Sequence, residues 1–177
     1  SYGKMINRKH FERVFGLIDR NKLVFGGEAR EETLQIAPTL LWDVTGEDAV
    51  MQEEIFGPVL PVLEVASMEE ACEFVRKRPR PLALYLFTGD RETERRFLER
   101  LSFGGGCIND TVIHLATSEM GFGGVGASGM GSYHGRKSFE TFSHEKSVVK
   151  KYTWLDLPMR YQPYTMLKER LVRMFVK

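Results

Sequence analysis

The chain has 177 residues, of which 42% are hydrophobic and 28% are charged, and its formal net charge is +1 at pH 7. This length and composition predict one globular domain of ordinary size with its own hydrophobic core. Because 25 Lys and Arg residues balance 24 Asp and Glu residues, the composition excludes a general attraction to nucleic acid or to an anionic membrane surface.

The first expected element is a helix that begins after Asn7, whose side chain can cap it. A short strand is expected at residues 22–25, where two glycines end it. Residues 34–44 form a second extended run, and Pro38 within it favours a sheet edge or an irregular path. The apolar face of the helix repeats at helical spacing and consists of Phe11, Val14, Phe15 and Ile18.

A buried strand is expected at residues 59–65, and the capping box of Ser67 and Glu70 starts the helix that follows it. A further apolar strand is expected at residues 82–87, and Asp90 caps a second, highly charged helix. Strands that alternate with helices predict an α/β fold with a mostly parallel sheet and flanking helices. The expected inward positions are Ala71, Cys72 and Val75 on the first of these helices, and Phe97, Leu98 and Leu101 on the second.

Glycine dominates the next part of the chain, where ten of the 17 glycines lie between Gly104 and Gly135. Such a density predicts turns and close approaches of backbone to backbone. Beyond it, residues 147–152 favour a strand, and residues 166–177 mix apolar and basic residues in the manner of an amphipathic helix.

Two carboxylates, an aromatic ring and a Gly-Pro turn stand together at residues 52–59, just before an apolar run. A carboxylate beside a buried strand is costly to desolvate unless a partner binds it. A ribose suits this purpose, because one carboxylate accepts hydrogen bonds from both of its hydroxyls. An aromatic residue two positions on shares a face with it on an extended backbone and can cover the flat ring that the ribose carries. The local chemistry is compatible with a cofactor clamp, but the residues alone favour the simpler interpretation, a solvated acidic loop before a core strand.

Several blocks resemble the aldehyde dehydrogenase superfamily, and they occur in the family's order. Residues 53–59, Glu-Glu-Ile-Phe-Gly-Pro-Val, resemble a strongly characteristic segment of the family, and residues 103–111 resemble its Gly-Gly-x-Cys-x-Asn-Asp segment. Residues 121–135 are similar to its Phe-Gly-Gly-x-Gly-x-Ser-Gly-x-Gly turn, and residues 138–146 follow as expected. The tail at residues 156–164 is similar to the class 3-like branch, which acts on medium-chain, fatty and aromatic aldehydes.

The resemblance implies that residues 1–143 are the C-terminal part of the catalytic domain, and that residues 144–177 are an oligomerisation strand and tail. It implies NAD or NADP as cofactor, a small-molecule aldehyde as substrate, and a homo-oligomer, expected to be a dimer. The family's nucleophilic cysteine, general-base glutamate and phosphate-binding loops lie upstream of the matched region. We therefore expect a C-terminal fragment that is inactive alone, with a non-catalytic interaction or scaffold module as the alternative.

Carried over residue by residue, the resemblance assigns the nicotinamide ribose to Glu54 and the nicotinamide contact to Phe56, whereas Glu53 serves the loop itself. Phe122 matches a position that lines the aldehyde pocket. His114 and Met120 are expected beside it, and for these two residues ordinary turn packing is an equal alternative.

Other features of the sequence have simpler interpretations. Two Gly-x-Gly-x-x-Gly matches between Gly121 and Gly129 lack the flanking apolar strand and helix of a dinucleotide fingerprint. Cys107 is expected in the core rather than as a nucleophile. The four histidines lack metal-ligand spacing, and His134 and His144 are expected to orient loops by hydrogen bonding. With two cysteines in no Cys-x-x-Cys pair, no signal-peptide pattern and no long apolar run, we expect a cytoplasmic location and no stable membrane anchor.

Overall fold

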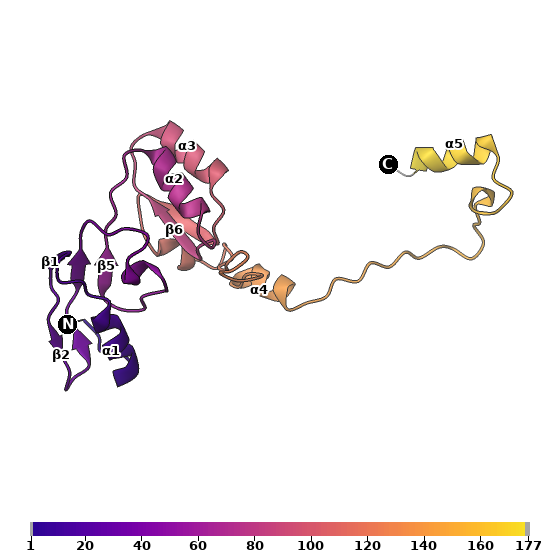
Figure 1. Cartoon of the computed structure of the whole chain (residues 1–177). Helices are drawn as coiled ribbons and strands as arrows, with labels where there is room; N and C mark the ends of the chain where they lie inside the picture. The colour runs from indigo at the N-terminus through magenta and orange to yellow at the C-terminus, as the bar shows by residue number, and fades with distance from the viewer. Residues whose placement is uncertain (1, 176–177) are drawn as a thin grey trace.

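The computed structural model describes residues 2–175 of the chain. Three parts follow one another in Figure 1: an N-terminal part around α1 and β1 to β5, a second part around α2, α3 and β6, and an arm that leads from α4 to the distant α5. The architecture is mixed α/β, as the sequence predicts, but the strands are distributed over three small sheets.

The N-terminal part contains a three-stranded sheet in the order β1-β4-β5 and a small antiparallel β2-β3 hairpin. β4 pairs antiparallel with β1 and parallel with β5, so that Thr39 lies opposite Val59. The bounds of its elements are α1 (Arg8–Gly16), β1 (Leu23–Phe25), β2 (Ala29–Arg30), β3 (Gln35–Ile36), β4 (Thr39–Leu41), the 3-10 turn η1 (Ala49–Met51) and β5 (Val59–Pro61).

The first helix begins where the sequence predicts. The Asn7 Oδ1 atom accepts a hydrogen bond of 2.9 Å from the backbone N–H of His10, which satisfies one of the unpaired donors of the first turn. Val14 on its inner face is completely buried. A Cβ atom on Gly57 would lie only 2.7 Å from the Val14 Cγ1 atom, so the close approach of the 56–58 turn to α1 requires glycine. The core of this part consists of Met5, Phe11, Val14, Ile18, Ile36, Leu41, Val44, Val50 and Val59.

The path around Pro38 differs in part from the expectation. Pro38 lies in the irregular connection between β3 and β4, where it needs to supply no ladder hydrogen bond. The strand directly after it, β4, is nevertheless the central strand of its sheet. The strand expected at residues 59–65 is shorter than its apolar run, because only Val59–Pro61 pair with β4.

The second part is a parallel β-α-β arrangement. β6 (Ala83–Leu86) pairs with β7 (Gly105–Ile108), and α2 (Met68–Arg76) and α3 (Arg91–Arg100) pack together beside them. The Ser67 Oγ atom accepts from the backbone N–H of Glu70 at 3.2 Å, whereas the Glu70 carboxylate accepts from Ala66 rather than from Ser67 itself. The buried residues are Cys72, Phe97 and Leu101. Leu98, which the sequence analysis placed inward, is 52% exposed, because it lies on the solvent side of α3.

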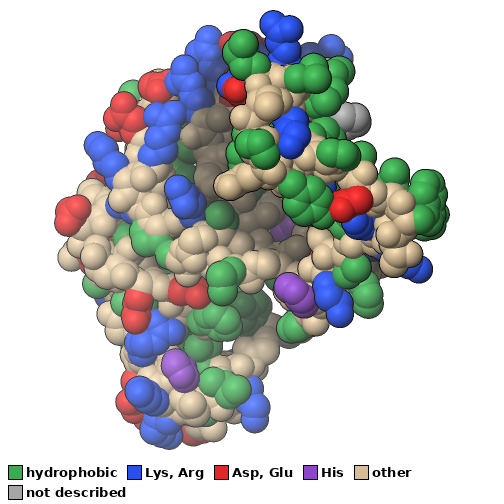
Figure 2. Space-filling view, turned by 90° about the vertical axis from the view of Figure 1, so that its right-hand side faces the viewer, with side chains coloured by type: hydrophobic (Ala, Val, Ile, Leu, Met, Phe, Trp, Pro, Cys, Tyr) green, Lys and Arg blue, Asp and Glu red, His purple; other side chains and the backbone are tan. Residues whose placement is uncertain are grey.

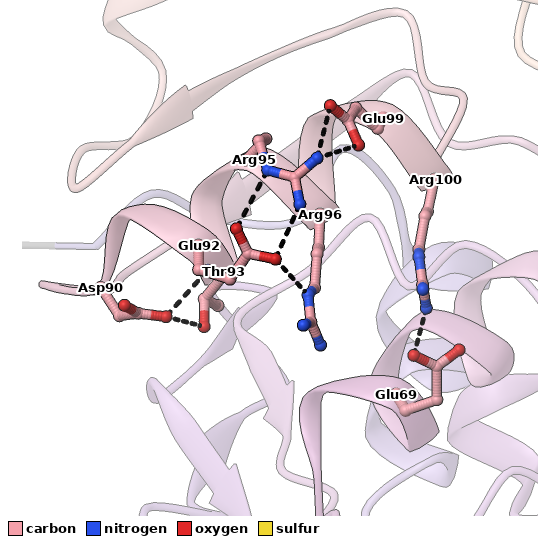
Figure 3. Close-up of polar contacts among 8 residues, drawn as sticks. All are labelled: Glu69, Asp90, Glu92, Thr93, Arg95, Arg96, Glu99 and Arg100. Carbon is pink, nitrogen blue, oxygen red and sulfur yellow. Dashed lines mark hydrogen bonds and ion pairs between the residues drawn. The ribbon is translucent and has the colours of Figure 1, made fainter.

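Charged side chains cover the outer surface of α3 (Figure 3). Glu92 binds Arg95 at 2.7 Å and Arg96 at 2.8 Å. Hydrogen bonds from Arg95 and then Arg96 lower the pKa of Glu92 from its ordinary value of 4.5 to about 2. Arg100 pairs with Glu69, so the same surface also joins α3 to α2. The start of α3 is fixed separately, by Asp90, which accepts from the Thr93 N–H at 2.8 Å.

The glycine-rich part forms turns rather than a regular sheet. It contains η2 (Ile113–Leu115), an isolated bridge between Phe122 and Tyr133, and the seven-residue helix α4 (Gly135–Thr141). The arm beyond it contains η3 (Pro158–Arg160) and α5 (Met166–Phe175). The amphipathic helix expected at residues 166–177 is confirmed for Met166–Phe175, and its last two positions lie outside the described residues.

Residues 147–152, expected to form a strand, have no strand hydrogen bonds among the described residues. Val149 is 96% exposed and Val148 is 75% exposed, so this segment has no neighbour to pair with in a single chain. Figure 2, viewed from the side of the arm, shows hydrophobic side chains exposed over much of this face. None of the helices in the described part of the chain is long and apolar enough to cross a membrane.

Candidate functional site

The loop between η1 and β5 is held in place by one residue of α1. The Arg13 Nη1 atom forms an ion pair of 2.8 Å with the Glu53 carboxylate. Its Nη2 atom donates to the Ile55 carbonyl at 2.7 Å, and Nη1 makes a longer contact of 3.4 Å with the Glu54 carbonyl. Three successive residues of the loop are therefore fixed by a single guanidinium, and Glu53 serves the loop, as the sequence suggests.

Glu54 differs from Glu53 in that its carboxylate does not bind another residue of the described structure. It is exposed, and no hydrogen bond or ion pair to its side chain occurs among residues 2–175. Only its backbone is engaged, through the Arg13 contact. Both carboxylate oxygens remain able to accept hydrogen bonds from a ligand, and this is the chemistry that two vicinal hydroxyls require.

Phe56 is presented to solvent by an unusual backbone conformation. Its φ of 48° lies in the left-handed region, which is uncommon for a residue that is not glycine, and its side chain is 78% exposed. Because the backbone is not extended at Phe56, Glu54 and Phe56 do not share a face by simple strand alternation, contrary to the prediction. Its ring lines a cavity of about 690 Å³ together with residues of the N-terminal segment, namely Tyr2, Gly3, Lys4, Met5, Ile6 and His10.

An exposed aromatic side chain on a strained backbone is a costly arrangement, and such arrangements concentrate at functional sites. With the unengaged Glu54 carboxylate two residues away, this loop offers acceptors for a sugar and a flat apolar surface for a ring. The residues thus fit the nicotinamide ribose half of a dinucleotide in their chemistry.

A second group of candidate residues forms an aromatic cluster within the glycine-rich part of the chain. The ring of Phe122 lies 5.8 Å from His114, 5.7 Å from Tyr133 and 6.2 Å from His134, measured between ring centres. The ring of Tyr85 on β6 lies 5.7 Å from that of His114. Phe122 and Tyr133 also exchange backbone hydrogen bonds of 2.8 and 3.0 Å.

The structure brings the rings of His114 and Phe122 together, and Met120, two residues before Phe122, is 51% exposed. Sequence reasoning missed Tyr85 and Tyr133 as members of the cluster. Tyr85 could have been found from its place in the strand predicted at residues 82–87. That strand pairs with the strand of Cys107, and Tyr85 lies opposite Cys107. No hydrogen bond, ion pair or aromatic contact between described residues connects this cluster with Glu54 or Phe56.

His114 is 9% exposed, and its buried ring packs against Cys107 and Gly105. The Nδ1 atom lies 3.6 Å from the Cys107 Sγ atom, whereas Nε2 is buried without a partner among the described residues. A Cβ atom on Gly105 would lie 2.9 Å from the ring, so glycine is required for this packing. Cys107 lies half-buried on β7 with its thiol toward an imidazole.

His134 takes part in loop hydrogen bonding through its backbone, and the described residues give its imidazole no hydrogen bond. Its Nδ1 atom is buried without a partner in the described structure, and the ring packs at 4.4 Å against Tyr133. The backbone N–H of His134, and not its imidazole, donates to Ser138 at 2.8 Å and starts α4. The aromatic packing prevails because the turn directs the ring toward Phe122.

The glycines of residues 121–129 close a tight turn. Gly126 bridges to Gly129, and a Cβ atom on Gly124 would lie 2.1 Å from the Ser128 carbonyl oxygen. The 3-10 turn η2 precedes this segment, and the seven-residue α4 begins only at Gly135, which is not the strand and helix of a dinucleotide fingerprint. Within residues 2–175, no three His, Cys, Asp or Glu side chains group to hold a metal ion.

Comparison with known proteins decides the family. The sequence profile described as the aldehyde dehydrogenase family matches residues 1–148. The chain belongs to the aldehyde dehydrogenase family. It is 51% identical over 165 residues to 4,4'-diaponeurosporen-aldehyde dehydrogenase of Staphylococcus aureus, and this match covers 92% of this chain and 36% of that protein. It is also 45% identical over 177 residues to aldehyde dehydrogenase family 3 member H1 of Arabidopsis thaliana, covering 98% of this chain and 37% of the relative.

A third relative is the dimeric NADP-preferring aldehyde dehydrogenase of Bos taurus, 51% identical over 148 residues, with 84% of this chain and 62% of that protein covered. These relatives place the chain in the class 3-like branch. The solved structure of the substrate-bound state of Staphylococcus aureus AldH superposes with a TM-score of 0.91 at 49% identity, covering 99% of this chain and 39% of that one. The chain thus spans between about a third and two thirds of the length of these aldehyde dehydrogenases.

Proposed function

We propose that this chain supplies the nicotinamide-binding and substrate-lining part of an NAD(P)-dependent aldehyde dehydrogenase that oxidises aldehydes to carboxylic acids. The observation that carries the proposal is the contrast between two neighbouring glutamates: Arg13 engages Glu53, and Glu54 is left without a partner in the described structure. Family membership supports the reaction class, and one relative is named NADP-preferring.

In this proposal Glu54 accepts hydrogen bonds from the two hydroxyls of the nicotinamide ribose. Phe56 contacts the nicotinamide ring, and Arg13 holds the loop so that both residues keep their positions. The bound dinucleotide supplies the hydride acceptor for the reaction. Such fixed placement of a reactant is a major source of rate in a reaction with two substrates.

Phe122 is proposed to line the aldehyde pocket, with His114 behind it. The packing of Tyr85, Tyr133 and His134 around these two rings gives an apolar wall that suits an aldehyde with a hydrocarbon chain. Met120, exposed two residues before Phe122, is proposed as a flexible contact at the edge of this wall.

We further propose that residues 1–143 act as the catalytic-domain part and residues 144–177 as the assembly part. The exposed valines of the arm support a role in pairing with a second copy, and the Bos taurus relative is named dimeric. The same exposed arm favours a second candidate function, a non-catalytic interaction module that retains this half of the dehydrogenase fold.

Binding of NADH and NADPH to the full-length enzyme that contains this chain, followed by the fluorescence of the reduced nicotinamide, tests the proposal. Saturable binding is expected, and Glu54→Gln should weaken it by about tenfold or more through loss of charged hydrogen bonds. Glu64→Gln is the matched control, because Glu64 is also an exposed glutamate but follows β5, whereas the loop precedes it. Binding that is equal in both variants would remove Glu54 from the site, and association without cofactor binding would favour the interaction module.

A further inference from the structure

A small basic cavity lies where the C-terminal ends of α2 and α3 meet. Its volume is about 200 Å³. Arg76 is the last residue of α2, and Arg100 is the last residue of α3. The other residues of the cavity that follow these helices lie in the connections to β6 and to β7. Four arginines and no carboxylate line this arginine pocket, which consists of Val75, Arg76, Arg78, Arg80, Arg100, Leu101 and Ser102.

Some of these arginines have structural roles that fix their positions. The Arg78 guanidinium lies 3.4 Å from the centre of the Phe74 ring and donates to the Phe74 carbonyl at 3.1 Å. The Arg76 Nε atom makes a contact of 3.4 Å with the Arg100 carbonyl. Arg100 itself pairs with Glu69, as Figure 3 shows. The side chains of Arg76, Arg78 and Arg100 are thus held by contacts within the chain, which lowers the entropy cost of binding a ligand.

Stabilisation of helix ends does not account for all four charges. Each helix C-terminus carries only about half a negative charge, and Glu69 adds one more. Arg76, Arg78 and Arg80 have no carboxylate within ion-pair distance among residues 2–175. The pocket therefore retains an excess of positive charge over an apolar floor that includes the buried Leu101.

We propose that the arginine pocket binds a phosphate group. Guanidinium groups present paired N–H donors that match the oxygens of a phosphate bidentately, and they remain charged at every physiological pH. The volume admits a phosphate or a diphosphate but not a whole nucleotide, so any remainder of the ligand lies outside. A soluble phosphate and a phospholipid headgroup share this chemistry. The site uses none of the residues proposed for cofactor binding, so either proposal can fail without the other.

Calorimetric titration of the 177-residue chain with pyrophosphate at low salt tests the inference. We expect saturable binding of one pyrophosphate per chain, and Arg80→Gln and Arg76→Gln should each weaken it by about tenfold. Arg91→Gln, at the opposite end of α3, is the matched control and should leave the affinity unchanged. Thermal unfolding followed by circular dichroism verifies that each variant folds.

The source of the phosphate is distinguished with vesicles of phosphatidylcholine that contain phosphatidic acid. Cosedimentation with these vesicles that Arg80→Gln abolishes would assign the pocket to a lipid headgroup, whereas tight pyrophosphate binding without cosedimentation would assign it to a soluble phosphate. Absence of saturable binding to both probes overturns the proposal. An equal loss of affinity in Arg91→Gln and Arg80→Gln overturns it as well, because binding would then reflect only the general surface charge.

Discussion

Arg13 and Glu53 stand 40 positions apart in the sequence, yet their 2.8 Å ion pair joins the first helix to the loop that carries Glu54 and Phe56. The Arg13 side chain is 25% exposed, and it also holds the Ile55 carbonyl. The position of the candidate cofactor loop thus depends on a residue outside the loop and outside its motif.

Replacing Arg13 by Met should release the loop while keeping the aliphatic part of the side chain. We expect a loss of about 1–3 kcal/mol in the free energy of unfolding, because charged hydrogen bonds to a carboxylate and a carbonyl disappear. Hydrogen exchange of the amides at residues 53–57 should accelerate at the same time. Lys9→Met on the same helix, at an exposed position, should change neither quantity.

Gly57→Ala should destabilise the chain through its contact with α1. The new Cβ atom would meet the Val14 Cγ1 atom at 2.7 Å, and Val14 is fully buried and cannot move aside. Overpacking of this kind costs about 1–3 kcal/mol. In a denaturant-unfolding cycle, the double variant with Val14→Ala should lose less stability than the sum of the two single variants. Strict additivity would show that the two side chains do not compete for space.

The acid stability of α3 should depend on Glu92. Its pKa in the folded chain is about 2, below the ordinary value of 4.5, because Arg95 and Arg96 hold its charged form. A depressed carboxyl pKa contributes stability that is present above pH 4.5 and is lost as the pH falls from 4.5 toward 2. Glu92→Gln should therefore reduce the change of the helical circular dichroism signal with pH between 4.5 and 2. Because Glu92 is exposed and screened, salt should reduce the difference.

The 177-residue chain should not oxidise aldehydes by itself. Neither Cys72 nor Cys107 lies in a motif that resembles the family's nucleophile, and Cys72 is only 1% exposed. Aldehyde-dependent formation of NADH, measured at 340 nm, should stay at the level of the buffer. NADH formation that disappears in Cys107→Ser would contradict this prediction and would give a catalytic meaning to the 3.6 Å contact between Cys107 and His114.

Self-association should depend on the arm. Unpaired extended backbone with exposed valines recruits a second chain, and Val149 is almost fully exposed. Sedimentation of the chain should therefore show a dimer or a larger assembly. Val148→Asp with Val149→Asp should shift it toward the monomer, whereas Met130→Asp, at an equally exposed apolar residue outside the arm, should not. A monomer at all concentrations would exclude the arm as an assembly element.

Features that depend on near neighbours in sequence could be predicted well. The caps at Asn7, Ser67 and Asp90 and the buried positions Val14 and Cys72 follow from side-chain chemistry and helical spacing within a few residues. The predictions for Glu54 and Phe56 came from a motif, but the reason why Glu54 alone remains unengaged is a contact from Arg13, which no local pattern indicates.

The errors also have a common physical cause. Leu98 is predicted inward from its hydrophobicity, yet the fold buries Phe97 and Leu101 and leaves Leu98 on the solvent side of α3. The strand at residues 147–152 stays a prediction, because its expected partner is a second subunit. The central position of β4 follows from its pairing with both β1 and β5, while the neighbouring Pro38 suggested an edge. The family-like segment that contains His134 predicts loop hydrogen bonding, and the fold packs its imidazole among the rings of Phe122 and Tyr133.

The three helix caps imply an order of events when the chain folds. Each cap joins residues only three positions apart, so the first turns of α1, α2 and α3 can form and dissolve within the unfolded chain. The parallel ladders are different, because they pair residues about 20 positions apart, Thr39 with Val59 and Ala83 with Gly105. The entropy cost of closing these loops precedes the hydrogen bonds that offset it. Amides of the capped turns should therefore gain protection from exchange earlier in refolding than those of β4, β5, β6 and β7.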